Sequence, residues 1–291
     1  MSPTAITLIL VAAVGHACWN LFSKQAASAG AVSFIWLTST AATIAYVPVI
    51  AITVAVTRPQ LSAASWVFLA GTGVLQAGYF LFLQSGYRLG DLSLVYPIGR
   101  GTGALLAAVA GIAWLGERPG PVAIAGIAAL VAGIAVIGVP AQPSDGTARP
   151  PAGLAIMFAL LTGMFIASYT LWDRHAVAVL HTPALLQGYA AFPVMAVVFG
   201  PQARRARDRT ARMWQEYRAQ VLGAAVLMPL TYMLVLIALS FTAVAVVAPA
   251  REVSVLFGVL IGRRLLDEGS TARRLAAATA IVAGIVAIAV G

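Results

Sequence analysis

Three charged residues, Arg100, Arg251 and Glu252, are expected inside the hydrophobic segments of this sequence. Arg100 follows Pro97 by three residues, and Arg251 follows Pro249 by two. An arginine at the middle of a bilayer costs roughly 2.5 to 3.5 kcal/mol on insertion scales, so a chain with two of them is expected to give them a water-filled or protein-lined site. Because guanidinium groups bind carboxylates and phosphonates through paired hydrogen bonds, the arginines predict a site for a small anionic or zwitterionic solute.

Two interpretations of these charges remain open. The side chains of Arg251 and Glu252 point about 100° apart on a helix, so Glu252 is expected to meet Arg100 rather than its neighbour. Such a contact is either a buried structural ion pair or part of a site that meets solute or protons directly. If protons drive the cycle, Glu252 is the expected carrier and His16 is the next candidate.

The other candidate substrate-binding residues are polar or aromatic: His16, Trp19 and Asn20 in the first hydrophobic segment, Tyr79 in the third and Tyr96 in the fourth. His16 is equally well explained as a hydrogen-bonded core histidine. The amide of Asn20 needs partners in an apolar helix, and either a neighbouring helix or the substrate would supply them. The two tyrosines would give a cavity hydrogen bonds and aromatic walls.

Pro97 and Pro249 lie 152 residues apart, at corresponding places in two similar halves of the chain. Each proline removes a backbone hydrogen bond and bends its helix, and the carbonyl group that is freed needs water or another partner. We expect these kinks either to shape a cavity or to serve helix packing alone.

Catalytic and cofactor-binding patterns are absent from the sequence. The three histidines have no metal-ligand spacing, and no phosphate-binding loop or nucleophile motif occurs. Asp173, Asp208 and Asp267 are expected in loops, without a paired arrangement. The sequence therefore predicts neither an enzyme nor an ATP-driven pump, and it predicts no metal and no cofactor.

The composition indicates an all-α, multi-pass membrane protein. Of 291 residues, 61% are hydrophobic and 9% are charged, whereas a soluble domain carries about 25% charged residues. Apolar runs long enough to cross about 30 Å of hydrocarbon recur ten times. The ten predicted transmembrane helices cover residues 4–24, 31–56, 63–87, 92–115, 121–138, 152–172, 182–200, 218–240, 242–265 and 271–290.

The net charge of +9 would suggest nucleic acid as a partner of a soluble protein, but here most basic residues fall in short loops, where they report orientation. Counting the loops alternately places thirteen basic residues on one side and three, Arg58, Arg118 and Arg174, on the other. The first side is therefore predicted to be cytoplasmic and both termini external. We therefore expect the protein to lie in the lipid bilayer of the inner or plasma membrane and not to bind nucleic acid.

The chain repeats itself. Residues 17–24 align with residues 167–174 at an offset of 150, matching small, aromatic, polar and basic positions in order. We divide the chain into a first five-helix repeat at residues 1–140, a linker rich in Pro, Gly and Ser at 141–151, and a second repeat at 152–291. Because each unit holds an odd number of spans, the second enters the membrane from the opposite face, as in the inverted repeats of many secondary transporters.

These features resemble the EamA family of the drug/metabolite transporter superfamily: two five-helix copies, a small and aromatic pattern ending the first helix of each, and a proline in each fourth helix. The resemblance implies movement of small metabolites, such as amino acids or phosphonate-like compounds, through a cavity between the repeats, often outward. A lipid-carrier flippase on the same fold is the alternative, and it would need a groove open sideways to lipid. The substrate, direction, coupling ion and oligomeric state stay open at this point.

Overall fold

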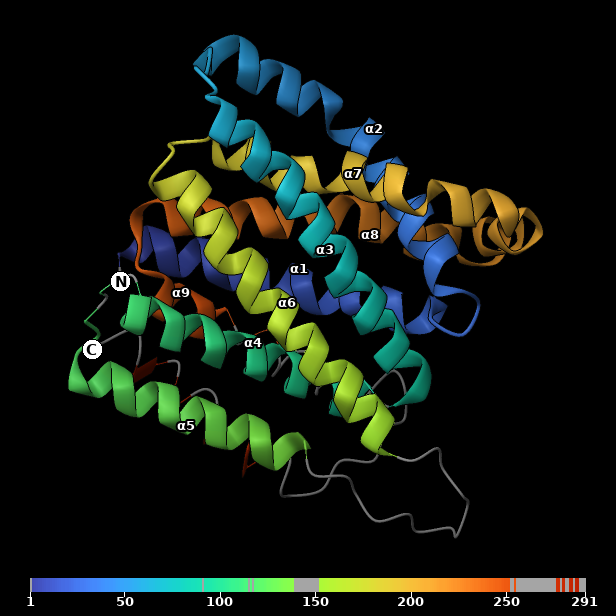
Figure 1. Cartoon of the computed structure of the whole chain (residues 1–291). Helices are drawn as coiled ribbons and strands as arrows, with labels where there is room; N and C mark the ends of the chain where they lie inside the picture. Colours follow the sequence, from blue (N-terminus) through green and yellow to red (C-terminus); the bar gives the residue numbers. More distant parts are fainter. Residues whose placement is uncertain are drawn as a thin grey trace, which may run out of the picture.

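The computed structural model describes residues 2–90, 92–114, 116, 118–138 and 152–251, together with residues 254, 276–277, 279–280, 283–284 and 286–287. Every regular element in this part of the chain is a helix (Figure 1). The helices are α1 (Pro3–Ala26), α2 (Ala31–Thr57), α3 (Ala63–Leu89), α4 (Leu92–Trp114), α5 (Pro121–Gly138), α6 (Ala152–Ala178), α7 (Ala184–Arg205), α8 (Arg207–Phe241) and α9 (Val244–Ala250).

Short polar side chains and prolines set where several helices begin. The hydroxyl of Ser2 accepts a hydrogen bond from the backbone N–H of Ala5 at 3.2 Å, and Ser62 does the same for Ser65 at 3.1 Å. Each bond satisfies one backbone donor that has no partner within the helix. α5 begins at Pro121, where a missing N–H has no cost because the first turn leaves that group unpaired.

In the described part of the chain, seven helices are long and apolar enough to cross a membrane: α1, α2, α3, α4, α6, α7 and α8. Within α5, residues Pro121–Gly133 form a shorter apolar helix. The described part of α9 has seven residues, and most of the tenth predicted span, 271–290, lies outside the described residues. The structure therefore confirms an all-helical, multi-pass membrane protein, and the number of ten spans stays a prediction.

Two predicted boundaries are wrong. The segment 204–218, most of which the predicted spans 182–200 and 218–240 leave as a loop, is helical almost throughout: α7 runs to Arg205 and α8 starts at Arg207. The break at Ala206 and a second break inside α8, at Tyr217 (φ −124°, ψ 22°), are the only departures from helical geometry in this segment. The segment lacks Gly and Pro and contains six Arg, two Ala and one each of Met, Gln and Glu, which are good helix formers that a hydropathy pattern does not register. At the other boundary, α6 continues six residues beyond its predicted end at residue 172.

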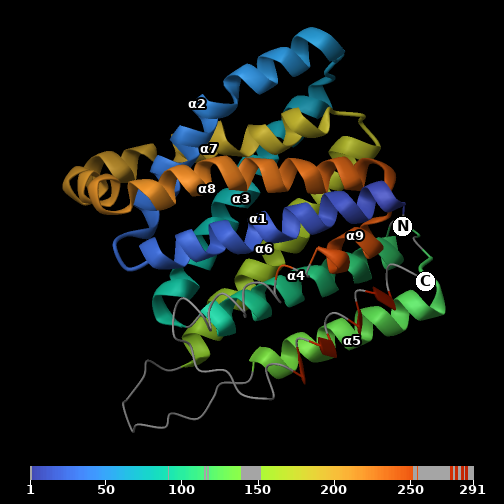
Figure 2. The same ribbon diagram turned by 180° about the vertical axis from the view of Figure 1, so that it is seen from behind.

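The helices of the two halves pack in matching pairs. α1 packs against α8, and α3 packs against α6; α2 packs against both α7 and α8, and α3 also packs against α7. If α1, α2 and α3 are exchanged with α6, α7 and α8, the α1–α8 contact becomes α3–α6, the α2–α8 contact becomes α3–α7, and the α2–α7 contact is unchanged. α1 and α6 also cross the bundle in opposite directions, as Figures 1 and 2 show. This is the relation expected for a repeat inserted in the opposite sense.

Glycines let α4 and α6 approach closely. A Cβ on Gly163 of α6 would lie 2.9 Å from the carbonyl oxygen of Gly99 on α4, and a Cβ on Gly103 would lie 3.2 Å from the carbonyl oxygen of Gly163. Gly99 and Gly103 are four residues apart, the spacing of small residues that allows helix backbones to touch in membranes. This contact holds Arg100, the neighbour of Gly99, against the second half of the chain.

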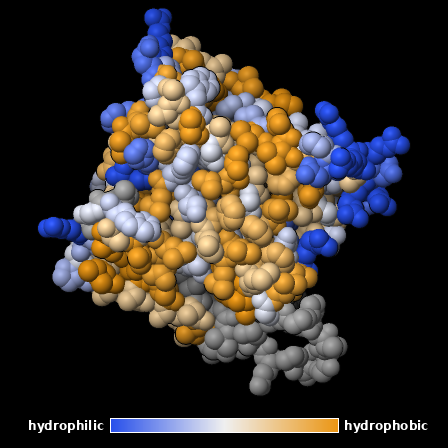
Figure 3. Space-filling view, in the orientation of Figure 1, coloured by the Kyte–Doolittle hydropathy of each residue, from blue (hydrophilic) through white to orange (hydrophobic). Residues whose placement is uncertain are grey.

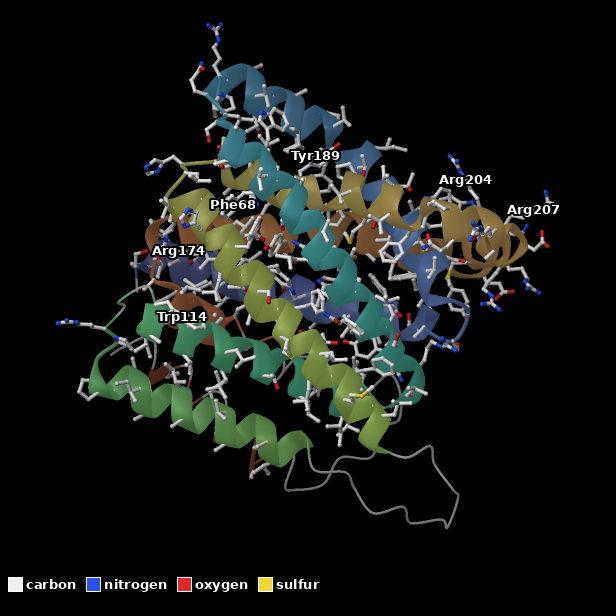
Figure 4. All side chains as sticks on the ribbon, in the orientation of Figure 1. Phe68, Trp114, Arg174, Tyr189, Arg204 and Arg207 are labelled. Atoms are coloured by element: carbon white, nitrogen blue, oxygen red, sulfur yellow. The ribbon has the colours of Figure 1, made fainter. Side chains whose placement is uncertain are left out.

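Hydrophilic groups gather at opposite ends of the helices, and a hydrophobic surface covers the region between them (Figure 3). Arg204 and Arg207 project at one end, whereas Trp114 and Arg174 lie at the other (Figure 4). We name the first the basic end, because the basic residues of the 204–218 segment lie there. A groove of about 360 Å³ at the basic end is lined by residues that include Trp36, Trp214 and Arg204.

Candidate functional site

Residues predicted to bind substrate come together in the interior. α1 supplies His16, Trp19 and Asn20, which are 5%, 2% and 1% exposed. α3 supplies Tyr79, and α4 supplies Tyr96, and both rings are buried. With the two arginines, we call this set the arginine site. Its members come from both halves of the chain, although they were chosen from the sequence one segment at a time.

Arg100 and Arg251 are each 1% exposed and are the two largest fully buried side chains of the described residues. Arg100 lies within α4, and Arg251 comes directly after α9. The Nη2 atom of Arg251 donates to the hydroxyl of Thr170 on α6 at 3.4 Å. Both guanidinium groups are close enough to His16 and to Tyr79 to act on them electrostatically. The arginines of the two halves therefore border the same region, as their matching positions predict.

A row of aromatic contacts lines this region. The ring of His16 meets Trp19 at 5.3 Å between centroids, and Trp19 meets Phe80 at 5.7 Å. Phe80 contacts Tyr79 at 4.6 Å, and Tyr79 contacts Tyr169 of α6 at 5.5 Å. Edge-to-face pairs of this kind stabilise the packing by about 0.5 to 1.5 kcal/mol each beyond the buried area. The row joins α1, α3 and α6 and gives the region a rigid, mostly aromatic wall.

The three α1 residues differ in whether their polar atoms have hydrogen-bond partners. The amide of Asn20 is satisfied by its own protein: it donates to the carbonyl of His16 at 2.7 Å and accepts from the hydroxyl of Tyr87 at 2.7 Å. Nδ1 of His16 and Nε1 of Trp19 are buried without a hydrogen-bond partner among the described residues. A buried polar atom left unpaired costs about 1 to 3 kcal/mol, so these two atoms are the ones that a ligand would stabilise.

The remaining predicted residues lie on α4 and around α9. The hydroxyl of Tyr96 donates to the hydroxyl of Ser254 at 2.8 Å, which ties α4 to the segment after α9. Pro97 is buried inside α4. Pro249 belongs to α9, but its side chain is outside the described set, and Glu252 lies outside the described residues altogether. The predicted contact of Glu252 with Arg100 therefore stays a prediction.

Asp173 was expected in a loop, and this is wrong. α6 runs on to Ala178, and the side chain of Asp173 is 0% exposed. The statement that only three charged residues lie within the hydrophobic spans therefore also fails, because Asp173 is a fourth. The run Asp173, Arg174, His175 lowers the local hydropathy and looks like the end of a span, but the helix has enough polar partners in its neighbours to stay buried.

Three helices supply partners to the carboxylate of Asp173. Its Oδ2 atom accepts a hydrogen bond from the hydroxyl of Thr72 on α3 at 3.0 Å and another from the hydroxyl of Tyr232 on α8. Its Oδ1 atom accepts from Nε2 of Gln187 on α7 at 2.7 Å. All three partners are neutral, and Arg251 acts on the carboxylate electrostatically from further away. We call Asp173, Thr72, Gln187 and Tyr232 the Asp173 cluster.

The internal repeat carries a signal that would have found this cluster. Residues 17–24 align with 167–174, so Ser23 is the counterpart of Asp173. Ser23 is also buried, 1% exposed, and its hydroxyl accepts a hydrogen bond from Gln84 on α3. In each half, therefore, the last polar residue of this motif on the first helix binds a polar side chain on the third helix. A polar position shared by both copies indicates a buried contact that hydropathy alone does not show.

Comparison with known proteins identifies the family. The EamA-like transporter family matches this chain twice, over residues 3–139 and 153–290. The chain belongs to the EamA-like transporter family. It is therefore a member of the drug/metabolite transporter superfamily and a multi-pass membrane protein, as the sequence predicts. None of the curated proteins searched matches it.

A solved crystal structure of a protein, described no further, shares this fold. It superposes with a TM-score of 0.63 at 17% sequence identity, covering 97% of this chain and 98% of the other. At this identity the likeness extends to the fold alone. The EamA-like arrangement thus spans nearly the whole chain, and the residues of the arginine site and the Asp173 cluster are features of this sequence.

Proposed function

We propose that this EamA-like protein is a secondary transporter, working as an exporter, of a small anionic or zwitterionic metabolite such as an amino acid or a phosphonate-like compound. One observation carries the proposal: Arg100 and Arg251, one from each half, are both buried and act on the same two residues, His16 and Tyr79. Guanidinium groups bind carboxylates and phosphonates through paired hydrogen bonds, so an anion that reaches both arginines would contact both halves of the chain.

The neighbouring polar atoms support the same class of substrate. An anion accepts hydrogen bonds, and Nε1 of Trp19 is a buried donor without a partner among the described residues. Nδ1 of His16 is likewise unpartnered there, and a neutral imidazole offers one donor and one acceptor. The tyrosine and phenylalanine rings would pack against the apolar part of a small metabolite. We expect all these groups to bind in one cavity between the repeats.

Transport by this fold requires the two repeats to alternate around the site. The repeats at residues 1–140 and 152–291 are the proposed units, and residues 141–151 are the proposed linker between them. Ten spans in two inverted sets of five would place the site near the middle of the bilayer. Pro97 and Pro249 are the proposed hinge positions, because a proline weakens the helix at the carbonyl it leaves unpaired. The proposed location is the inner or plasma membrane.

Transport by purified protein in liposomes tests this function. A panel of labelled amino acids, phosphonates and cations is presented to the wild type and to Arg100→Lys, with Arg204→Lys at the exposed basic end as the matched control. Lysine keeps the charge but loses the two-pronged hydrogen bond, so anion transport should fall about tenfold to a hundredfold, as expected for one or two charge-assisted hydrogen bonds. Arg204→Lys should transport normally.

Two results would contradict the proposal. Full anion transport by a well-folded Arg100→Lys protein would remove Arg100 from the binding site. Transport of cations in preference to every anion in the panel would exclude the proposed substrate class. Aggregation of Arg100→Lys alone would instead support a structural ion pair, since breaking a buried pair costs far more than an exposed one.

A further inference from the structure

We propose that Asp173 binds a proton during the transport cycle, and that its protonation releases the contacts that tie α6 to α3 and α8. The inference rests on the proposed transport function only where it assigns the proton a role in transport. Proton binding and helix release can both be measured without substrate. It adds a site to the two carriers expected from the sequence, Glu252 and His16.

The position of the carboxylate is the first argument. Asp173 is fully buried in a helix that is long and apolar enough to cross a membrane, and its three hydrogen-bond partners are neutral. A carboxylate without an adjacent cation is costly in such surroundings, and ionisable residues inside membrane helices usually serve ion or proton pathways. Asp173 lies five residues before the end of α6, about 8 Å along the helix axis at 1.5 Å per residue. A proton therefore has only a short way to travel from the water at that end.

Hydrogen-bond geometry shows which contacts a proton would break. The ionised carboxylate accepts at both oxygens, with two bonds at Oδ2 and one at Oδ1. A proton on Oδ2 makes this atom a donor, so it competes with the hydrogens of Thr72 and Tyr232. The bonds to α3 and α8 are weakened, whereas the bond from Gln187 of α7 to Oδ1 is kept. Protonation thus acts selectively on two of the three neighbouring helices.

Gln187 keeps Asp173 tied to α7 in both protonation states. Its Nε2 atom is shared between Oδ1 of Asp173 and the carbonyl of Phe68, 3.1 Å away. Because Oδ1 stays an acceptor when the proton is on Oδ2, this bond does not depend on the ionised form. Nε1 of Trp172 also donates to the Phe68 carbonyl at 2.9 Å. The link to α7 therefore persists while the links to α3 and α8 weaken.

Within the described residues, few titratable and charged groups surround Asp173. α8 contributes Tyr232, and the ring of Tyr169, one turn earlier on α6, contacts Tyr232 at 5.6 Å. Arg251, after α9, acts on the carboxylate electrostatically. Arg174 and His175 follow Asp173 on α6, and His175 stacks on Phe68 at 5.1 Å.

The facing helices add little charge to these groups. α3 and α7 contribute the uncharged side chains of Thr72 and Gln187 to the cluster. Tyr79 of α3 meets Tyr169 rather than Asp173, and Arg100 of α4 acts on His16 and Tyr79. Among these groups, Arg251 is the cation that an anionic substrate would also engage. An anion bound at Arg251 would reduce its pull on the carboxylate and favour proton uptake, which is a direct physical route to coupling.

Infrared difference spectroscopy of the full chain in lipid nanodiscs tests proton binding. Spectra recorded across a pH series should contain the carbonyl stretch of a buried protonated carboxylic acid. The band should be lost in Asp173→Asn and kept in Asp208→Asn, which removes an exposed acid at the basic end. Thr72→Val removes one donor to the ionised form, so the band should persist and appear at higher pH. An unchanged band in a folded Asp173→Asn protein would overturn the inference.

Thiol labelling tests the release of the helices. Gln76 lies one turn from Thr72, is 5% exposed and donates to the Thr72 hydroxyl at 3.4 Å. A cysteine placed there in a Cys18→Ser background should react with a water-soluble thiol reagent several-fold faster at low pH, and at a high rate at every pH when Asp173→Asn is added. Equal rates throughout would refute the release of α3.

These measurements separate the inference from the proposed function. If the band is absent from wild type while Arg100→Lys still abolishes anion transport, the proton site is wrong and the function stands. If the band titrates as expected while Arg100→Lys transports normally, the proton site stands and the anion site is wrong.

Discussion

Ser23 and Asp173 hold equivalent positions in the two repeats, yet they bind their neighbours in different ways. Ser23 accepts a hydrogen bond from Gln84, and this pair links α1 to α3 with two uncharged side chains. Asp173 accepts bonds from three helices, including α8, the third helix of its own half. Ser23 lies near the basic end and Asp173 near the opposite end. A duplicated polar position has thus become a neutral link at one end and an ionisable link at the other.

This difference makes the two ends of the helix bundle chemically unequal. Two inverted copies with identical links would respond in the same way at both ends. Because the Asp173 link contains a carboxylate and the Ser23–Gln84 link does not, the proposed protonation acts on the α6 contacts and leaves the Ser23–Gln84 pair unaffected. Lys24, next to Ser23, strengthens the neutral link by donating to the carbonyls of Tyr87 and Gly90 at 2.9 Å each, at the end of α3.

Replacing Asp173 by leucine should have the largest effect on stability. The substitution leaves the hydroxyls of Thr72 and Tyr232 buried without their acceptor, and it removes one of the two acceptors of the Gln187 amide. Each orphaned group costs about 1 to 3 kcal/mol, so the free energy of unfolding should fall by several kcal/mol in total. Thermal unfolding in detergent measures the loss. A protein as stable as wild type would show that the cluster contributes little to the fold.

Converting the ionisable link into the neutral one should remove pH dependence. The double substitution Asp173→Ser with Tyr232→Gln reproduces the chemistry of the Ser23–Gln84 pair. Because no titratable group then remains in the link, the labelling rate of a cysteine at position 76 should become independent of pH. Tyr232→Gln alone keeps the carboxylate and should keep the pH dependence. A double variant that still responds to pH would place the responding group elsewhere.

Ser23→Ala should have a smaller effect, without any change in pH response. The side-chain amide of Gln84 loses its acceptor, and its Oε1 atom already lacks a partner among the described residues. The expected loss is about 1 to 2 kcal/mol of unfolding free energy, seen as a lower melting temperature. Ser33→Ala removes another buried hydroxyl at the same end, where it bonds to Thr210 at 2.9 Å, and serves as the control. A pH-dependent Ser23→Ala protein would contradict the contrast between the two links.

The last substitution places a cysteine at the basic end to report which end faces the cytoplasm, and we expect it to leave transport activity unchanged. The basic end is predicted to be inside, because basic loops stay on the cytoplasmic side. Ala206→Cys in a Cys18→Ser background should resist an impermeant thiol reagent in intact cells and react after permeabilisation. Reaction before permeabilisation would reverse the orientation and place the Asp173 cluster on the cytoplasmic side.

Sequence by itself determined the class of the protein and two of the three charged residues that are buried in the described part of the chain, Arg100 and Arg251 but not Asp173. Hydropathy gives most span boundaries to within a few residues, because apolar side chains must fill the length that crosses the bilayer. Arg100 and Arg251 were predictable because a charge inside an apolar run is conspicuous. The family match over both halves agrees with the resemblance in the sequence.

Only the tertiary structure decided where the polar boundary residues go. Asp173, Arg174 and His175 have the composition of a span's end, but Asp173 is buried because α3, α7 and α8 each bring a donor to it. Likewise, Asn20 and Trp19 are adjacent in sequence and equally buried, yet Tyr87 satisfies the one and no described residue satisfies the other. Hydrogen-bond partners come from other helices, and the geometry between helices is set by packing that no local pattern contains.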